Sequence, residues 1–357
     1  MKILVESNKK NGTLLYMKQL LLSLILGSSL LIASATSAKD VNKDSQNSAL
    51  PTINVDFITV GDGGNIEDRI TGLGAVAEPF NIGKFDITAK QYCAFLNAVA
   101  SQEDTYHLYN EQMTKDPNIA SIQCSVSSGL THYSVIPGRE QFPIVYVSWF
   151  SAARFCNWLH NNQPKGNQGP DTTETGAYEL NGAMKDIETS TESKNFCEVS
   201  PGAKYFIPTE DQWFKAAYYK SKGVNNGYWD YPTKTNIAPG NTIYSYVFYY
   251  DKTNQANYYI PTNIYKSSNA KAPFLTPVGA FKDSPGTYGT FDMGGNVFQW
   301  TSCKPGSTGS RTIRGGSWKL QMSDELNRKY CATYPSDKAC NFIGFRIAAP
   351  ATVTVPQ

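Results

Sequence analysis

The chain has 357 residues, of which 41% are hydrophobic and 13% aromatic, enough to form a substantial core in one large domain or two smaller ones. Its formal net charge is only +2 and no basic run stands out, which argues against nucleic acid and anionic membranes as partners. The 28 glycines and 19 prolines favour turns over long regular elements.

The N-terminal residues have the pattern of an export signal. Lys18 precedes an apolar run over residues 20–33, and Thr36-Ser37-Ala38 has the small side chains of a signal-peptide cleavage site. The run is too short for a comfortable membrane span, and no later stretch approaches the required length. We therefore expect a cleaved signal peptide at residues 1–38, with Met17 as an alternative start, and a secreted or periplasmic mature chain without a membrane span.

Removal of this signal leaves a nearly neutral chain. Residues 1–38 contain four lysines and one glutamate, a net charge of +3, so the mature chain carries 2 − 3 = −1. Seven cysteines remain, and in an oxidising compartment we expect some of them to form disulfides. None lies in a CxxC pair, which argues against zinc and thioredoxin-like sites. The seven are Cys93, Cys124, Cys156, Cys197, Cys303, Cys331 and Cys340.

The remaining chain is expected to form a single domain over residues 53–350. Polar, aperiodic residues 39–52 are interpreted as a linker before it, and residues 351–357 as a frayed tail. Within the domain, residues 101–141 show no sustained period and are expected to be mostly irregular. Residues 161–203 are polar and are expected to form a long surface excursion.

Three helix starts stand out. Thr88 with Gln91, and Thr209 with Gln212, have the spacing of a capping box, and Ser148 can cap a helix between them. Apolar residues at helical spacing follow each start, which predicts one buried face per helix. The residues expected on these faces are Tyr92, Phe95, Leu96 and Val99; Ala152, Phe155, Cys156 and Leu159; and Trp213, Ala216 and Ala217.

Strands are expected to be short. The candidates are residues 53–60, 81–87, 143–147, 312–318 and 342–348.

A glycine-rich stretch over residues 289–302 predicts a tight turn at Gly294 and Gly295, where other residues would be strained. Nearby aromatic side chains supply enough apolar area to bury it. A buried turn needs partners for its backbone polar groups, and neighbouring loops, a metal ion or ordered water could supply them. The aromatic residues are Phe291, Phe298, Trp300 and Trp318.

This stretch carries a resemblance to a known family. Residues 289–300 read Gly-x-x-Asp-Met-x-Gly-Asn-Val-x-x-Trp, and Arg-Gly-Gly-Ser-Trp at 314–318 and Gly-Phe-Arg at 344–346 follow. With earlier blocks near residues 82–92, 143–158 and 208–217, the chain resembles the formylglycine-generating enzyme (sulfatase-modifying factor) family, in particular an exported bacterial branch. The resemblance implies a compact, loop-rich α+β fold related to C-type lectins, with a few short helices and twisted antiparallel strands.

The resemblance also implies where oxidase chemistry would lie. Active members bind copper(I) through two cysteines, three and eight residues after the serine of the Gly-Gly-Ser-aromatic motif, and use O2 to convert a sulfatase cysteine to formylglycine. Counting from Ser317 gives Leu320 and Glu325, so both copper-binding cysteines are missing, and we do not expect copper. The nearest following cysteine, Cys331, could act only in a divergent enzyme.

A calcium site is the other feature that the resemblance implies. The family ligates calcium through a side chain at the Asp292 position, carbonyl oxygens at the Gly295 and Val297 positions, and a glutamate at the Gln299 position. Gln299 offers an amide oxygen but no charge, which should lower the affinity. The alternative is that Asp292 and Gln299 only hydrogen-bond the turn.

Two functions remain open at this point. The first is an exported binding or scaffold module without oxidase activity, whose ligand is a peptide, a protein or a glycan. The second is an enzyme, either a divergent copper-dependent oxidase or another oxidoreductase on the same scaffold. The enzyme would require a solvent-accessible Cys331 with a low thiol pKa.

Overall fold

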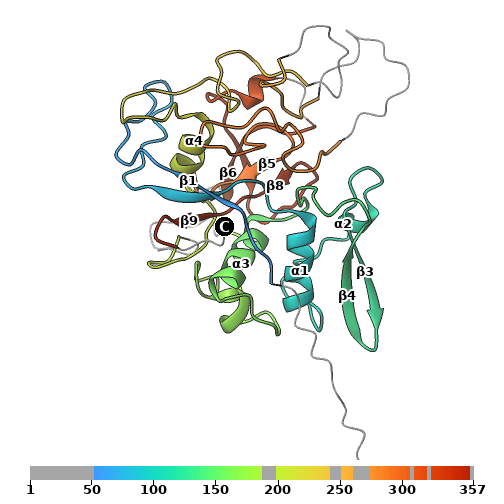
Figure 1. Cartoon of the computed structure of the whole chain (residues 1–357). Helices are drawn as coiled ribbons and strands as arrows, with labels where there is room; N and C mark the ends of the chain where they lie inside the picture. Colours follow the sequence, from blue (N-terminus) through green and yellow to red (C-terminus); the bar gives the residue numbers. More distant parts are fainter. Residues whose placement is uncertain are drawn as a thin grey trace, which may run out of the picture. The chain divides into compact units, whose positions relative to one another are not determined.

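The computed structural model describes residues 52–186, 198–241, 251–259, 274–305, 309–319 and 323–353. Residues 49–357 form one compact unit (Figure 1). The expected signal peptide, the linker before Thr52, Cys197, Leu320 and the end of the expected tail lie outside the described residues. Among the described residues, no helix has both the length and the apolar character needed to cross a membrane.

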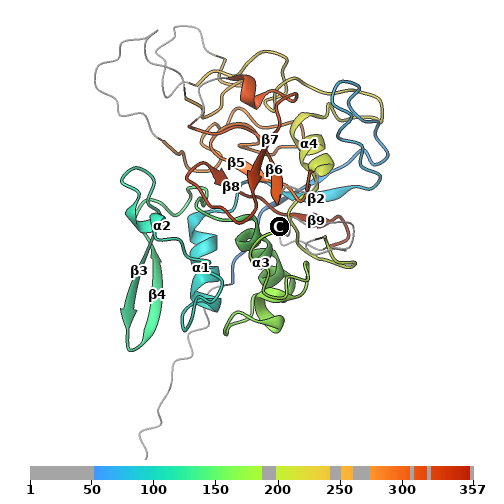
Figure 2. The same ribbon diagram turned by 180° about the vertical axis from the view of Figure 1, so that it is seen from behind.

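Within the described residues, the strands form three small sheets (Figures 1 and 2). An antiparallel sheet has the order β1 (Phe57–Val60), β2 (Phe80–Gly83), β9 (Ala348–Pro350). A second has the order β7 (Ala332–Pro335), β6 (Ser310–Arg314), β5 (Phe298–Trp300), β8 (Ile343–Gly344), in which only β5 and β8 are parallel. The third is the hairpin of β3 (Ile122–Ser127) and β4 (Leu130–Val135).

In the part of the chain that the structure describes, the helices are few and short. They are α1 (Ala89–Val99), α2 (Gln112–Lys115), α3 (Trp149–His160) and α4 (Glu210–Tyr218), with a π-helical turn η1 (Pro170–Glu174) and a 3-10 turn η3 (Ser323–Leu326). The capping boxes at Thr88 and Thr209 are both present, and the Ser148 hydroxyl accepts a hydrogen bond from the backbone N–H of Ser151. This mixture of short helices and small, mainly antiparallel sheets confirms the predicted α+β class.

The core lies where α1 and α3 pack side by side beneath the β5–β6 sheet (Figure 1). The rings of Phe95 and Phe155 meet edge to face at 5.3 Å, and Phe345, which follows β8, packs on Phe155 at 5.4 Å. All of the apolar helix positions expected from the sequence are buried. Tertiary packing therefore uses the helix faces that the periodicity predicted.

Two expectations about local structure were wrong, and a third region holds more structure than predicted. Residues 101–141 are mostly irregular, as predicted, but they also contain α2 and the β3–β4 hairpin, whose two-residue turn at Ser128 and Gly129 has positive φ at both positions. Most of its side chains are exposed, so the sequence shows no alternation of apolar residues that would predict the hairpin. Residues 143–147 are largely buried but not a strand, since Tyr146 has a φ of 62° and its N–H donates to the Cys340 carbonyl.

Residues 161–203 are not simply a surface excursion. The described part contains η1, in which Glu174 is 3% exposed and forms an ion pair of 2.6 Å with Arg154 of α3. A buried carboxylate needs such a partner. Because the segment is polar, its composition did not indicate that one of its side chains is buried in an ion pair.

Candidate binding site

Neighbouring loops, rather than solvent, satisfy the backbone of the glycine-rich turn. The N–H of Gly295 donates to the Gly315 carbonyl at 2.7 Å, and that of Asn296 donates to the Asn257 carbonyl at 2.7 Å. Gly295 has a φ of 80°, and a Cβ there would lie 2.5 Å from the Asn257 oxygen. Only glycine fits this close approach. The predicted buried turn is confirmed, and it is held by other parts of the chain.

The guanidinium of Arg346 lies fully buried beneath this turn. Its Nε donates to Oε1 of Gln299 at 2.7 Å, while Nη1 and Nη2 donate to the carbonyls of Gly83 and Phe291, each at 2.8 Å. One planar cation thus joins β2, the turn and β5.

Gln299 occupies the position at which the family resemblance places a calcium ligand. Its Oε1 accepts hydrogen bonds from Arg346 and from Nε1 of Trp213, the latter at 2.6 Å. Its amide nitrogen donates to the Asp292 carbonyl at 2.7 Å. A calcium ion would have to displace both donors and would lie beside a buried guanidinium, so this oxygen does not fit a cation ligand in the observed arrangement.

Asp292 itself is tied to the turn that precedes it. Its carboxylate accepts a hydrogen bond of 2.6 Å from the N–H of Gly279, and its φ is 54°. Burial raises the pKa of this carboxyl, although the Gly279 N–H and Arg346 oppose the shift. A hollow of about 10 Å³, the size of one water molecule, borders Asp292. No group of three or more His, Cys, Asp and Glu side chains among the described residues could hold a metal ion.

A second carboxyl, Asp86, lies beside Arg346. Its Oδ1 is 3.3 Å from Nη2 of Arg346, its side chain has no exposed surface, and neither oxygen has a hydrogen-bond partner. Burial raises the pKa of Asp86 to about 8, against the favourable charge of Arg346 and with a further contribution from the charge of Asp292. Asp86 could not be singled out from the sequence, because its environment is built from segments far apart in the chain.

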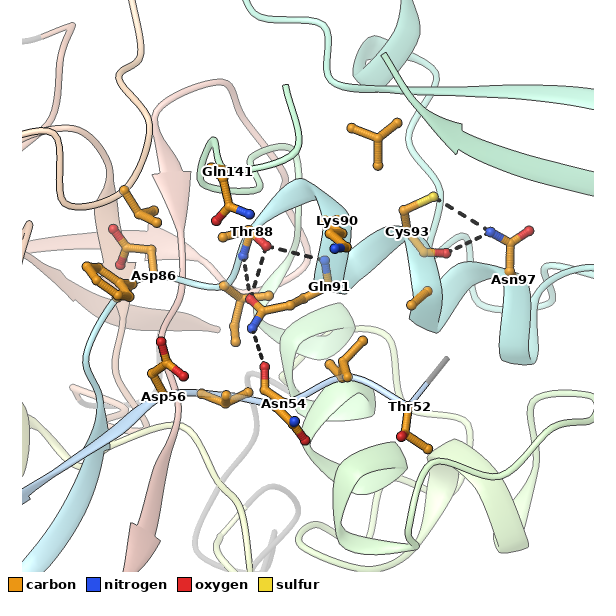
Figure 3. Close-up of a pocket in the computed structure, with 17 residues that line it drawn as sticks. Thr52, Asn54, Asp56, Asp86, Thr88, Lys90, Gln91, Cys93, Asn97 and Gln141 are labelled. Atoms are coloured by element: carbon orange, nitrogen blue, oxygen red, sulfur yellow. Dashed lines mark hydrogen bonds between the residues drawn. The ribbon is translucent and has the colours of Figure 1, made fainter. Parts of the chain in front are cut away.

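Asp86 forms part of the wall of a cavity of about 500 Å³ (Figure 3). Residues 52–56 form one side of it, and residues 85–97, which include most of α1, form the other. The side chain of Gln91 joins the two sides by donating to the Asn54 carbonyl at 2.8 Å. The volume falls within the range of small-molecule and side-chain binding sites. Sequence reasoning, which concentrated on the glycine-rich turn, missed this cavity.

The residues at the positions of oxidase chemistry lie elsewhere. Ser317 is fully buried, and its Oγ accepts a hydrogen bond of 3.4 Å from the N–H of Lys319. Glu325 stands where the family resemblance implies a copper-binding cysteine, and partial burial raises its pKa to about 7. Its Oε2 has no hydrogen-bond partner.

Cys331 is exposed, but its sulfur points at a carboxylate. The thiol donates to Oε1 of Glu210 at 3.8 Å, and the same oxygen accepts a 2.7 Å hydrogen bond from Nε of Arg314. Burial raises the pKa of the Cys331 thiol, with Arg314 opposing and Glu210 adding to the shift. Cys303 also hydrogen-bonds Glu210, so a second thiol lies close to the first. Both are free thiols.

The fold and these motifs place the chain in a known family. Residues 59–351 match the sulfatase-modifying factor enzyme 1-like domain, so the chain belongs to that family. Among curated proteins, the inactive C-alpha-formylglycine-generating enzyme 2 of Mus musculus is 25% identical over 224 residues, which cover 61% of this chain and 52% of that protein. The protein of the same name from Bos taurus is 21% identical over 224 residues, 61% of this chain and 54% of that protein. The chain thus spans about half the length of these relatives.

Two solved structures of similar fold are that of CarF and that of PvdO, the latter from Pseudomonas aeruginosa. CarF has a TM-score of 0.47 at 19% identity and covers 84% of this chain and 99% of its own. PvdO has a TM-score of 0.40 at 18% identity, and the match covers 84% of this chain and 92% of PvdO.

Proposed function

We propose that this chain is an exported binding or scaffold module on the sulfatase-modifying factor fold, without formylglycine-generating oxidase activity. The observation that carries the proposal is Glu325, a carboxylate with a raised pKa where copper(I) would need a soft thiolate. The curated relatives are themselves named inactive, which supports this reading. The ligand would be a peptide, protein or glycan group that enters the cavity beside α1.

An enzyme that uses Cys331 is the alternative function. A second thiol, Cys303, shares the Glu210 carboxylate with it and would be the second soft ligand in such an enzyme. The direction of the thiol pKa values weighs against this alternative, because a reactive cysteine needs a lowered pKa and both are raised.

The deciding experiment tests for oxidase chemistry directly. Purified chain, loaded with copper(I) under reducing conditions, would be incubated with O2 and a sulfatase-type cysteine peptide, and the peptide mass would be followed. We expect no loss of the cysteine thiol and no aldehyde. An authentic oxidase of the family serves as the positive control, and aldehyde formation that a Cys331→Ser variant abolishes would overturn the proposal.

The same preparation allows a measurement on the thiols. We expect Cys331 to react with iodoacetamide at pH 7 more slowly than a small free thiol, because its raised pKa leaves little thiolate. Copper(I) should not protect it. Export is tested separately, by N-terminal sequencing of the chain recovered outside the cytoplasm.

A further inference from the structure

We propose that the cavity between α1 and residues 52–56 binds an extended, uncharged peptide segment of another protein, which pairs its backbone with residues 54–56 as an added strand. The inference names the ligand class of the proposed binding function and rests on it. Its starting point is a pair of backbone N–H groups on the cavity wall that have no partner in the part of the chain that the structure describes.

The segment that leads into β1 has the alternating backbone directions of a strand. The N–H and the carbonyl of Ile53 both bond the side-chain amide of Gln163, at 2.8 and 2.9 Å, whereas the Asn54 carbonyl accepts from Gln91 of α1. Because successive residues of an extended segment direct their backbone groups to opposite sides, the N–H groups of Asn54 and Asp56 face α1. Neither donates to another described residue. Two unpaired donors at this spacing form a free strand edge.

The side-chain amide of Gln91 shows that the cavity has the width of a strand. Its Oε1 accepts from the N–H of Thr88 at 2.9 Å, and its Nε2 donates to the Asn54 carbonyl at 2.8 Å (Figure 3). One amide thus bridges the two walls, as a peptide group of a middle strand bridges its two neighbours. The cavity of about 500 Å³ follows the segment from Thr52 to Asp56, which leaves room beside this amide for a few residues of an extended ligand.

The cavity lining defines the side chains of the ligand. Ala94, Val135 and Val278 line it and are half-buried, so they leave apolar surface for a ligand to cover. Along the segment itself, the side chains of Asn54 and Asp56 are exposed and those between and before them turn inward. An added strand in register follows the same alternation. The ligand therefore has an aliphatic side chain at every second residue and polar side chains between them.

The charges around the cavity favour an uncharged ligand. Of the charged residues that line it, Asp56 and Lys90 are exposed and carry opposite charges, while Asp86 is buried beside Arg346. The first three N–H groups of α1 are bonded to carbonyls or to the cap hydroxyl, so the helix start offers no donors to an anion. Recognition therefore depends on backbone pairing and apolar contact.

The probe is acetyl-Thr-Val-Thr-Val-amide, and its control is acetyl-Thr-Ser-Thr-Ser-amide, which keeps the backbone and lacks the aliphatic side chains. Binding of each to the folded chain would be measured by NMR titration, and hydrogen exchange of the backbone amides would be followed with and without peptide. We expect the serine peptide to bind at least about tenfold more weakly than the valine peptide. Exchange at Asn54 and Asp56 should slow when the valine peptide is bound.

Asn54→Pro and Asn54→Ala form a matched pair of variants. Both remove the exposed side chain, but only proline removes the N–H that would donate to a peptide carbonyl. We expect the proline variant to bind the valine peptide at least about fivefold more weakly than the alanine variant. Ala94→Trp, which fills the cavity from α1, should also prevent binding, and Ser125→Trp on exposed β3 is its control.

Unchanged exchange at Asn54 and Asp56 in the saturated complex would overturn the strand pairing. Equal binding of the two peptides, or binding of neither, would overturn the ligand class. Self-association of the chain that the valine peptide reverses would make a second copy the occupant and overturn the assignment to another protein. If Asn54→Pro does not fold, hydrogen exchange in the unaltered chain still decides. Oxidase activity, measured separately, would contradict the proposed function and leave peptide binding as it is found.

Discussion

At the scale of single residues, the site is dominated by one buried cation with two buried acids. Arg346 donates hydrogen bonds to Gln299 and to backbone carbonyls, while burial raises the carboxyl pKa of both Asp86 and Asp292. Removal of Arg346 would take one of two donors from Gln299, remove the guanidinium donor from the Gly83 and Phe291 carbonyls, and leave the acids without a counter-charge. The glycine-rich turn is therefore built on a guanidinium, and the geometry around Gln299 leaves that amide oxygen to hydrogen-bond donors.

The raised pKa of Asp86 predicts how the stability of the folded chain depends on pH. Its folded pKa of about 8 lies above the ordinary value of 3.8, so the folded chain binds the proton more tightly than the unfolded chain. The protonated Asp86 therefore makes its whole contribution to the free energy of unfolding below about pH 4. This contribution is lost as pH rises towards 8, at up to about 1.4 kcal/mol per pH unit. We expect Asp86→Asn to gain stability relative to the unaltered chain between pH 5 and 8, as measured by urea unfolding.

The matched control for this measurement is Asp56→Asn, which removes an exposed carboxyl on the other side of the same cavity. This variant should change the dependence of stability on pH only slightly. Parallel stability profiles for the unaltered chain and Asp86→Asn would show that the folded pKa of Asp86 is close to its ordinary value.

At the scale of elements, α1, α3 and α4 were predictable because their signals are local, whereas the short helix α2 was not predicted. Thr88 with Gln91, and Thr209 with Gln212, form the reciprocal hydrogen bonds that their spacing predicts. The β3–β4 hairpin was not predicted, because its turn has no Asn-Gly or Asp-Gly signature and its side chains are mostly exposed. Elements that bury one face can be read from periodicity, whereas exposed elements cannot.

The cap of α4 provides the prediction at this scale. Thr209→Ala removes the hydroxyl that accepts from the Gln212 N–H at 3.1 Å, and we expect a loss of about 1 kcal/mol in the free energy of unfolding. Thr209→Ser keeps the acceptor and should lose much less. Equal stabilities of the Ala and Ser variants in urea would show that the cap contributes nothing measurable.

At the scale of the whole molecule, the question is whether a metal ion or the chain itself holds the loops together. Neighbouring loops satisfy the backbone of Gly295 and Asn296, and Arg346 and Trp213 fill the acceptor capacity of Gln299. Because other parts of the chain already provide partners for these polar groups, the turn can be complete without calcium.

We therefore expect removal of calcium to leave the stability unchanged. Thermal unfolding in EDTA and in millimolar calcium chloride should give the same Tm. A Tm that rises with calcium, and that no longer responds after Asp292→Asn, would establish the calcium site that the family resemblance implies. Magnesium chloride at the same ionic strength is the control for general salt effects.

The sequence by itself determined the family, the α+β class, the capped helices and the burial of the glycine-rich turn. Each of these depends on residues close in the chain or on motifs in a fixed order. It also showed Leu320 and Glu325 at the positions where the family resemblance implies copper-binding cysteines. Only the tertiary structure decided which side chains meet: Arg346 with Gln299 and Asp86, Cys303 with Cys331 at Glu210, and residues 52–56 with α1 around the cavity. The physical reason is that a charge's partners and a cavity's walls come from segments whose separation in sequence carries no signal of their proximity in space.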